Sequence, residues 1–332
     1  MPQKIHRRHP KNCQHEQGED NGAWTGEGNH LGCQCSMRMQ GLARYSDPVM
    51  LLIPLRTPTL KKGDDLADLL IEEEQIEQGD IVVISSKAVA TVEGAMIDLR
   101  GMIPSPEADA LSNRMHRSPQ FCEAMLRELE RLHGTVLGAV PGAALTELCP
   151  KGLATGRIVV ASAGLDESNA PQGFAIGWPK DPVKSVRTLR KELEQRMEGT
   201  DGTEETEGTE GMINEEPRSR RSRRSLRPPL VAVILSDSTC MPRRHGVTAF
   251  ALTVSGLDPL QNTEHADLFQ KPLLITTEAV ADQLCTAANF LMGNGAQSIP
   301  AVIIRDHGLT LSDWEGWVPG IEPERDLFQE LL

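Results

Sequence analysis

The stretch VVASAGLDESNA, residues 159–170, decides how the rest of this sequence is interpreted. Two valines favour a strand, four small residues follow, and then come Asp166, Ser168 and Asn169. A turn alone would account for Asp and Asn at the end of a strand. A site that a large ligand approaches closely would account for the small residues as well. The question is whether Asp166 is a turn residue or a ligand.

Strand and helix patterns alternate on both sides of this stretch. Apolar runs at 81–84 and 230–235 predict strands buried on both faces, whereas 245–256 alternates like a strand at an exposed edge. Helices are expected after Asp64 or Asp65, after Asp181, and after Thr276 or Thr277, each as an N-cap. Because the alternation is loose, we expect an α/β fold of the mixed α+β kind, with central mixed sheets and flanking helices.

The composition divides the chain into a folded part and polar segments. We expect a disordered tail at 1–46, a domain at 47–306 interrupted by a disordered insertion at 198–229, and a C-terminal tail at 307–332. The first tail contains several His and Cys residues, either zinc ligands or plain tail, and their spacing fits no regular finger. The arginines at 217–229 form either a nucleic-acid or membrane patch or a loop neutralised by its acidic neighbour.

Charge and composition exclude several classes of function. A net charge of −13 and an aromatic content of 3% make nucleic-acid binding unlikely. Seven irregularly spaced cysteines are typical of reduced thiols, so a cytoplasmic protein is expected. The sequence has no run of about 20 apolar residues that would predict a membrane span. It also has no phosphate-binding GxxxxGK[ST] loop, no GxGxxG after a strand and no GxSxG elbow.

Two acids stand out, because each follows an apolar run. Asp166 follows RIVVASAGL and Asp237 follows VAVILS. If the two strands are neighbours, the carboxylates converge at one edge of a sheet, where they would repel unless a cation lay between them. Oxygen ligands of this kind suit Mg²⁺ or Mn²⁺, which commonly bridge to nucleotide phosphates. The alternative is that both acids are turn or cap residues.

Lys87 poses a similar choice. It directly follows the predicted strand at 81–84 and two serines. A lysine at this place could meet a phosphate or a carboxylate as a point charge. Equally, it could be a solvated residue that ends the strand.

Eight segments follow one another in a recognisable order. They are IPLRTPTLKKGDDLADLL, GDIVVISSKAVATVEG, PSPEADAL, SAGLDESN, SDS, HGVTAFALTVSGL, ADLFQKPLLITTEAVADQLCTAANFLMG and IPAVIIRD. Together they resemble the coenzyme F420-0:L-glutamate ligase family. The resemblance implies a homodimer of mixed α/β fold that binds GTP and two divalent ions, Mg²⁺ or Mn²⁺, with K⁺ as a further candidate ion. It implies that a deazaflavin-type carboxylate is phosphorylated by GTP and that the amine of L-glutamate then attacks the acyl phosphate.

The resemblance also assigns residues. The implied metal ligands are Asp166, Asp237, Ser238 and Asn294. The implied nucleotide-binding residues are Thr57, Pro58, Thr59, Leu60, Ser86, Thr91 and Asn169. No catalytic residue is assigned. On this interpretation, residues 161–164 are small because a nucleotide–metal complex lies against them.

Some positions depart from the family pattern. Thr91 stands where the family has a second lysine, and Val247 and Ala249 stand where it has Gln and Asp. Three hypotheses therefore remain open. The first is a GTP- and metal-dependent γ-glutamyl or related ligase, the second is a non-catalytic or substrate-shifted paralogue that binds nucleotide or another ligand, and the third is an adaptor that binds nucleic acid through its arginines.

Overall fold

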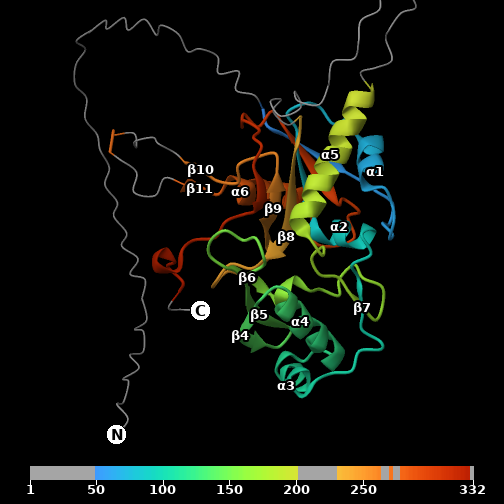
Figure 1. Ribbon diagram of the computed structural model, residues 1–332, viewed down its shortest axis with the longest axis vertical. Helices are drawn as coiled ribbons and strands as arrows, with labels where there is room; N and C mark the ends of the chain where they lie inside the picture. The colour runs from blue at the N-terminus through green and yellow to red at the C-terminus, as the bar shows by residue number, and fades with distance from the viewer. Residues whose placement is uncertain (1–48, 201–229, 263–268, 272–276, 330–332) are drawn as a thin grey trace, which may run out of the picture. The chain divides into compact units, whose positions relative to one another are not determined.

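The computed structural model describes residues 49–200, 230–262, 269–271 and 277–329 (Figure 1). The predicted tail at 1–46, with its His and Cys residues, and nearly all of the predicted insertion lie outside these residues. The helix before the insertion ends at Thr200, so it includes the first residues assigned to the insertion.

A mixed six-stranded sheet forms the centre of the fold and confirms the predicted class. Its strands lie in the order β1 (Leu51–Leu55), β12 (Ala301–Arg305), β2 (Ile81–Ser85), β8 (Ala232–Thr239), β9 (Thr248–Ser255) and β13 (Glu315–Trp317). Only β2 and β8 pair in parallel, and the other neighbours are antiparallel. The two parallel strands end beside each other, with Ser85 opposite Ser236.

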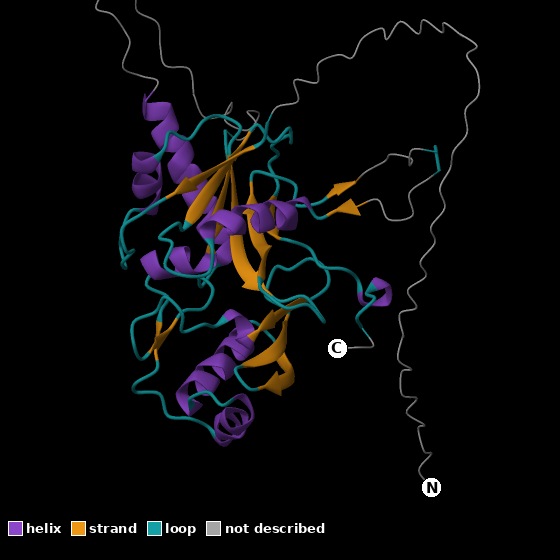
Figure 2. Ribbon diagram, turned by 180° about the vertical axis from the view of Figure 1, so that it is seen from behind, coloured by secondary structure: helices purple, strands orange, loops and turns teal. Residues whose placement is uncertain are grey.

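Helices cover both faces of this sheet, which explains the consecutive apolar residues of β2. Val82 and Ile84 pack in the cluster that contains α1 (Leu66–Glu73) and α5 (Pro182–Thr200). Ile81 and Val83 pack against α6 (Val280–Met292) on the opposite face (Figure 2). Burial on both faces is therefore confirmed for this strand.

Two of the three predicted caps are confirmed. Asp65 accepts a hydrogen bond from the Asp68 backbone N–H at 3.0 Å, and Asp181 accepts one from Lys184 at 3.0 Å. The prediction for α6 is wrong, because Ala279 precedes this helix and no side chain caps it. Among the described helices, none has the length and apolar character needed to cross a membrane.

A smaller antiparallel sheet lies below the central one (Figure 1). Its strands are β4 (Thr135–Val140), β5 (Ala143–Leu148) and β6 (Ile158–Ala161). Helices α3 (Pro106–Met115) and α4 (Pro119–Arg131) lie next to it, separated near Pro119 as expected. Two short pairs complete the description: β3 (Ile97–Asp98) with β7 (Phe174–Ala175), and β10 (Gln261–Asn262) with β11 (Thr277–Glu278). The strand before Asp166 and the strand that carries Asp237 are therefore not neighbours.

The C-terminal segment changes two predictions. Residues 315–317, expected in a tail, form β13 and pair with β9, so β9 is not an edge strand. Trp317 at the end of β13 is 6% exposed and belongs to the main apolar cluster. Alternation along β9 could not reveal this, because the strand that covers it comes about 60 residues later in the chain.

Candidate functional site

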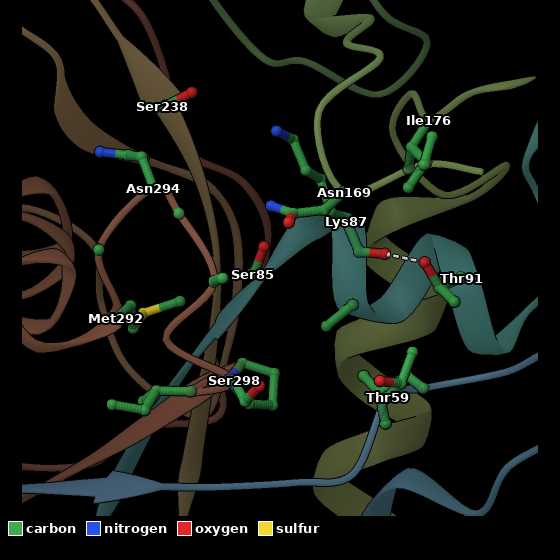
Figure 3. Close-up of a pocket in the computed structure, with 18 of the residues that line it drawn as sticks. Thr59, Ser85, Lys87, Thr91, Asn169, Ile176, Ser238, Met292, Asn294 and Ser298 are labelled. Carbon is green, nitrogen blue, oxygen red and sulfur yellow. Dashed lines mark hydrogen bonds between the residues drawn. The ribbon is translucent and has the colours of Figure 1, made fainter. Parts of the chain in front are cut away.

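A pocket of about 540 Å³ opens where the two parallel strands of the central sheet end (Figure 3). Most of its lining comes from the loop after β1, from α2 (Ser86–Val92), from residues 169–171, from the end of β8 and from the end of α6 with the loop after it. Backbone turns and small side chains make up much of its wall, including Gly293, Gly295 and Ala296. The sheet thus brings together segments that are far apart in the sequence.

Most residues implied by the resemblance lie at this pocket. Those in its lining are Pro58, Thr59, Leu60, Thr91, Asn169, Asp237, Ser238 and Asn294. Thr57 lies behind the wall and donates its backbone N–H to the carbonyl of Ser298 at 3.1 Å. Ser86 is buried at the first turn of α2, and Asp166 lies outside the lining but contacts Lys87, which is part of it.

Lys87 connects the pocket to Asp166. Its ammonium group donates to Oδ2 of Asp166 at 2.5 Å and to Oγ of Ser168 at 2.8 Å. Partial burial alone would raise the pKa of Asp166, but hydrogen bonds from Lys87 and Ser168 outweigh it and hold that pKa well below its ordinary value. Lys87 was predicted either to contact a phosphate or a carboxylate or to be solvated, and the structure shows it bound to a carboxylate.

Asp237 lies inside β8 rather than after it, and its environment differs. Trp178 donates its indole N–H to Oδ2 of Asp237 at 2.5 Å, and the Ser238 backbone N–H donates to Oδ1 at 2.8 Å. Burial raises the pKa of Asp237. The two hydrogen bonds, the nearby charge of Lys87 and a hydrogen bond with Ser86 act in the opposite direction and lower it, but burial outweighs them. Lys87 therefore acts electrostatically on both acids.

The structure gives a different reason for the small residues before Asp166. Ser162, Ala163 and Gly164 all have left-handed backbone, with φ of 49°, 56° and 72°. A Cβ at Gly164 would lie 2.5 Å from Nε1 of Trp178. Residues 161–164 do not line the pocket. The tight turn and the neighbouring indole account for their small size, and the expectation that a ligand lies against them stays a prediction.

The turn and a short backbone ladder place Asp166. Asp166, five residues after the end of β6 at Ala161, exchanges backbone hydrogen bonds of 2.9 and 2.8 Å with Ile176. The Asp166 carboxylate also accepts the Ser168 backbone N–H at 3.0 Å, as an Asx turn does. Asp166 is thus a turn residue that is also ion-paired with Lys87, and its role as a ligand stays a prediction.

Thr91 has a local partner. Its hydroxyl donates to the backbone carbonyl of Lys87 at 2.7 Å, one helical turn earlier (Figure 3). It therefore contributes a methyl and a satisfied hydroxyl to the pocket wall, with no charge. Opposite it, Ser238 and Asn294 lie on the far side of the pocket (Figure 3).

The donor set is compatible with a hard divalent cation. Asp166, Asp237, Ser238 and Asn294 offer two carboxylates, a hydroxyl and an amide, all through oxygen. In the part of the chain that the structure describes, His, Cys, Asp and Glu nowhere gather in threes to form a complete cage. Two carboxylates completed by water and phosphate oxygens are the usual way in which Mg²⁺ is bound.

Trp178 is a residue of the site that sequence patterns did not indicate. It lies in a Gly-Trp-Pro loop with no strand or helix periodicity, so no pattern pointed to it. The one available signal was the rarity of aromatic residues in this chain.

Comparison with known proteins agrees with this geometry. The family described as F420-0:Gamma-glutamyl ligase matches residues 54–201 and 225–306, which include both acids, Lys87 and every segment that lines the pocket. The chain belongs to this family. The F420-0:Gamma-glutamyl ligase match ends before β13 and therefore does not include Trp317.

Individual members of this ligase family are similar to this chain over most of its length. The coenzyme F420:L-glutamate ligase of Methanopyrus kandleri is 33% identical, over 81% of this chain and 93% of the relative. The ligase of the same name from Methanothermobacter thermautotrophicus is 31% identical, over 82% and 95%. That of Methanocaldococcus jannaschii is 30% identical, over 84% and 96%.

Proposed function

We propose that this chain is a carbon–nitrogen ligase that joins L-glutamate to a coenzyme F420-type carboxylate, using GTP, a divalent ion and an acyl phosphate intermediate. The names of the relatives support ligation of glutamate in coenzyme F420 metabolism. The nucleotide, the metal and the intermediate are inferred from the resemblance and from the chemistry of the pocket. K⁺ and the homodimer remain part of the proposal.

One observation carries the proposal. Lys87 is ion-paired with Asp166 and acts electrostatically on Asp237, and it lines a pocket of about 540 Å³ that is walled by backbone turns. Phosphoryl transfer needs positioning and neutralisation of charge more than it needs a covalent partner from the protein. A lysine and two ionisable carboxylates at the mouth of such a pocket supply these requirements without a phosphate-binding loop.

The proposed reaction has two steps. A carboxylate oxygen of the acceptor attacks the γ-phosphorus of GTP, and GDP leaves with the electrons of the broken P–O bond. The amine of glutamate then attacks the acyl carbon, phosphate leaves with the electrons of the C–O bond, and the amine loses a proton to water. In this scheme Lys87 orients a phosphate oxygen, whereas the wall residues Pro58 to Leu60 and Gly293 to Ala296 exclude water.

A divalent ion at this site would be held by Asp166 and Asp237, with Ser238 and Asn294 as candidate oxygen donors. When bound, such an ion reduces the repulsion between phosphate oxygens and the incoming carboxylate. Lys87 must then exchange its partner Asp166 for a phosphate. In this scheme the Lys87–Asp166 ion pair precedes that exchange.

Calorimetric titration with GTP and Mn²⁺ tests the proposal. We expect the wild type to bind and Asp166→Ala/Asp237→Ala to lose binding. A discontinuous assay then measures GDP release, which should require both L-glutamate and a deazaflavin carboxylate. A wild-type protein that binds no GTP in the presence of Mn²⁺ would contradict the proposal.

A second candidate is a paralogue that binds nucleotide without turnover or that uses another acceptor. Thr91 favours it, because its hydroxyl is satisfied by Lys87 and provides no positive charge. The loop after β8 points the same way, since Val247 is 52% exposed and offers no polar group. GTP binding without GDP release in the presence of any acidic acceptor would support this candidate over the ligase.

A further inference from the structure

Trp178 lies where the two acid-bearing segments meet. Its indole ring is 2% exposed, and a buried indole N–H needs an acceptor. That acceptor is Oδ2 of Asp237, at 2.5 Å. The ring also lies against Gly164 so closely that an added Cβ would be 2.5 Å from Nε1. A single side chain thus contacts both β8 and the turn before Asp166.

The backbone strengthens this connection. Trp178 comes two residues after Ile176, which pairs with Asp166 through two backbone hydrogen bonds. The loop that carries Trp178 is therefore fixed to the segment that carries Asp166. Because β6 and β8 belong to different sheets, no strand pairing sets the position of Asp166 relative to Asp237.

The C-terminal segment packs against this indole from the other side. The rings of Trp178 and Trp317 have centroids 5.9 Å apart, with planes inclined by 50°. Trp317 in turn donates its indole N–H to the Lys151 carbonyl at 3.2 Å, in the loop before β6. This contact links β13 of the central sheet to the smaller sheet and limits the room in which Trp178 can move.

We propose that Trp178 is a positioning residue that sets the separation and orientation of Asp166 and Asp237 and thereby the affinity of the site for a divalent cation. The inference rests on the proposed function. Residues that hydrogen-bond to metal-binding carboxylates commonly change metal affinity 10- to 100-fold when they are replaced. A tryptophan that merely fills the core would affect folding stability and leave the affinity of the folded protein for metal unchanged.

The test measures Mn²⁺ binding to the full chain by electron paramagnetic resonance, without nucleotide. We expect Trp178→Phe, which keeps an aromatic ring but loses the N–H donor, to bind Mn²⁺ about 10- to 100-fold more weakly. Trp314→Phe is the matched control, since Trp314 packs in the cluster on the opposite face of the sheet. Equal Mn²⁺ affinity in Trp178→Phe and wild type would overturn the inference.

A second measurement covers the case in which Trp178→Phe does not fold. In protein labelled with ¹⁵N-tryptophan, the four indole signals are assigned by replacing Trp24, Trp314 and Trp317 in turn. We expect the Trp178 signal to shift on addition of Mg²⁺ and in Asp237→Asn. A Trp178 signal that moves in neither experiment would also overturn the inference.

Failure of the inference can be distinguished from failure of the proposed function. If Asp166→Asn and Asp237→Asn bind Mn²⁺ as the wild type does, the proposed metal site itself is wrong. If they lose Mn²⁺ while Trp178→Phe keeps it, the metal site stands and only the positioning role is wrong.

Discussion

Nζ of Lys87 lies 2.5 Å from Oδ2 of Asp166. This ion pair joins α2, which follows β2 of the central sheet, to the loop that follows β6 of the smaller sheet. Lys87 follows β2, whereas Asp166 follows β6, and 79 residues separate them in the sequence. The ammonium group lies at the carboxylate that a divalent cation would use. On the proposed function, lysine and metal would compete for the same oxygen.

Lys87→Met should change metal and nucleotide binding in opposite directions. Without the competing ammonium group, we expect Mn²⁺ to bind several-fold more tightly to the protein alone. GTP should bind at least tenfold more weakly, because a phosphate loses its positive partner. Calorimetry measures both affinities, with Lys191→Met, an exposed position on α5, as the control. Weakened binding of both ligands would contradict the competition.

Asp166→Asn should reduce the loss of stability in acid. The folded protein holds the pKa of Asp166 below the value of about 3.9 expected in the unfolded chain. The unfolded chain therefore takes up the proton first, and this contribution to stability, present above pH ~4, is lost as the pH falls. Urea unfolding at pH 6 and pH 3.5 measures the difference. Asp313→Asn, at an exposed site, should keep the full acid dependence of the wild type.

Asp237→Asn should make the protein more stable at neutral pH. Burial raises the pKa of Asp237. The group therefore contributes to the stability of the folded protein while it is protonated, and this contribution is lost as the pH rises through its pKa in the folded protein. A neutral amide can still accept the indole N–H of Trp178. We expect a gain of about 1 kcal/mol, or about 2–4 °C in the midpoint of thermal unfolding. A lower midpoint than wild type at pH 7 would refute this sign.

Gly164→Ala should disturb the site through Trp178. The added methyl group would lie 2.5 Å from Nε1, at a residue with φ of 72°. We expect a cost of about 1–3 kcal/mol in the free energy of unfolding and weaker Mn²⁺ binding. Gly101→Ala is the control, because that glycine has no positive φ and no atom within 4 Å of an added Cβ. Similar behaviour of the two variants would show that the close approach is unimportant.

Trp317→Ala should destabilise the fold more than Trp314→Ala. Trp317 is 6% exposed and packs against Trp178, whereas Trp314 is only half-buried. Truncation of a fully buried tryptophan costs about 3–5 kcal/mol. Guanidinium unfolding monitored by circular dichroism compares the two variants. Equal costs would mean that residues 315–317 do not belong to the stable core.

Local patterns in the sequence predicted the strands and helices of the central sheet well. The apolar run of β2 required burial on both faces, and the structure covers both faces. Asp65 and Asp181 precede their helices and cap them. These features depend on neighbours within a few residues, so periodicity and capping rules apply directly.

The candidate site was predictable in its residue types but not in its pairings. Asp166, Asp237 and Asn169 were singled out from the sequence; Asp237 and Asn169 line the pocket, and Asp166 is joined to it through Lys87. Their convergence on a shared sheet edge was wrong, because β6 and β8 belong to different sheets. Strand neighbours are chosen by packing of the whole chain, and a single sequence carries little information about that choice.

Sequence patterns were enough to predict a mixed α/β protein, two prominent acids and a lysine beside a buried strand. The pairing of Lys87 with Asp166, the hydrogen bond from Trp178 to Asp237 and the addition of β13 to the central sheet became visible in the folded protein. The difference lies in how far apart in the sequence the interacting residues are. Strand formation and capping depend on residues close in the chain, whereas these contacts join residues at least 59 positions apart. Such contacts exist only after the core has brought the two sheets together.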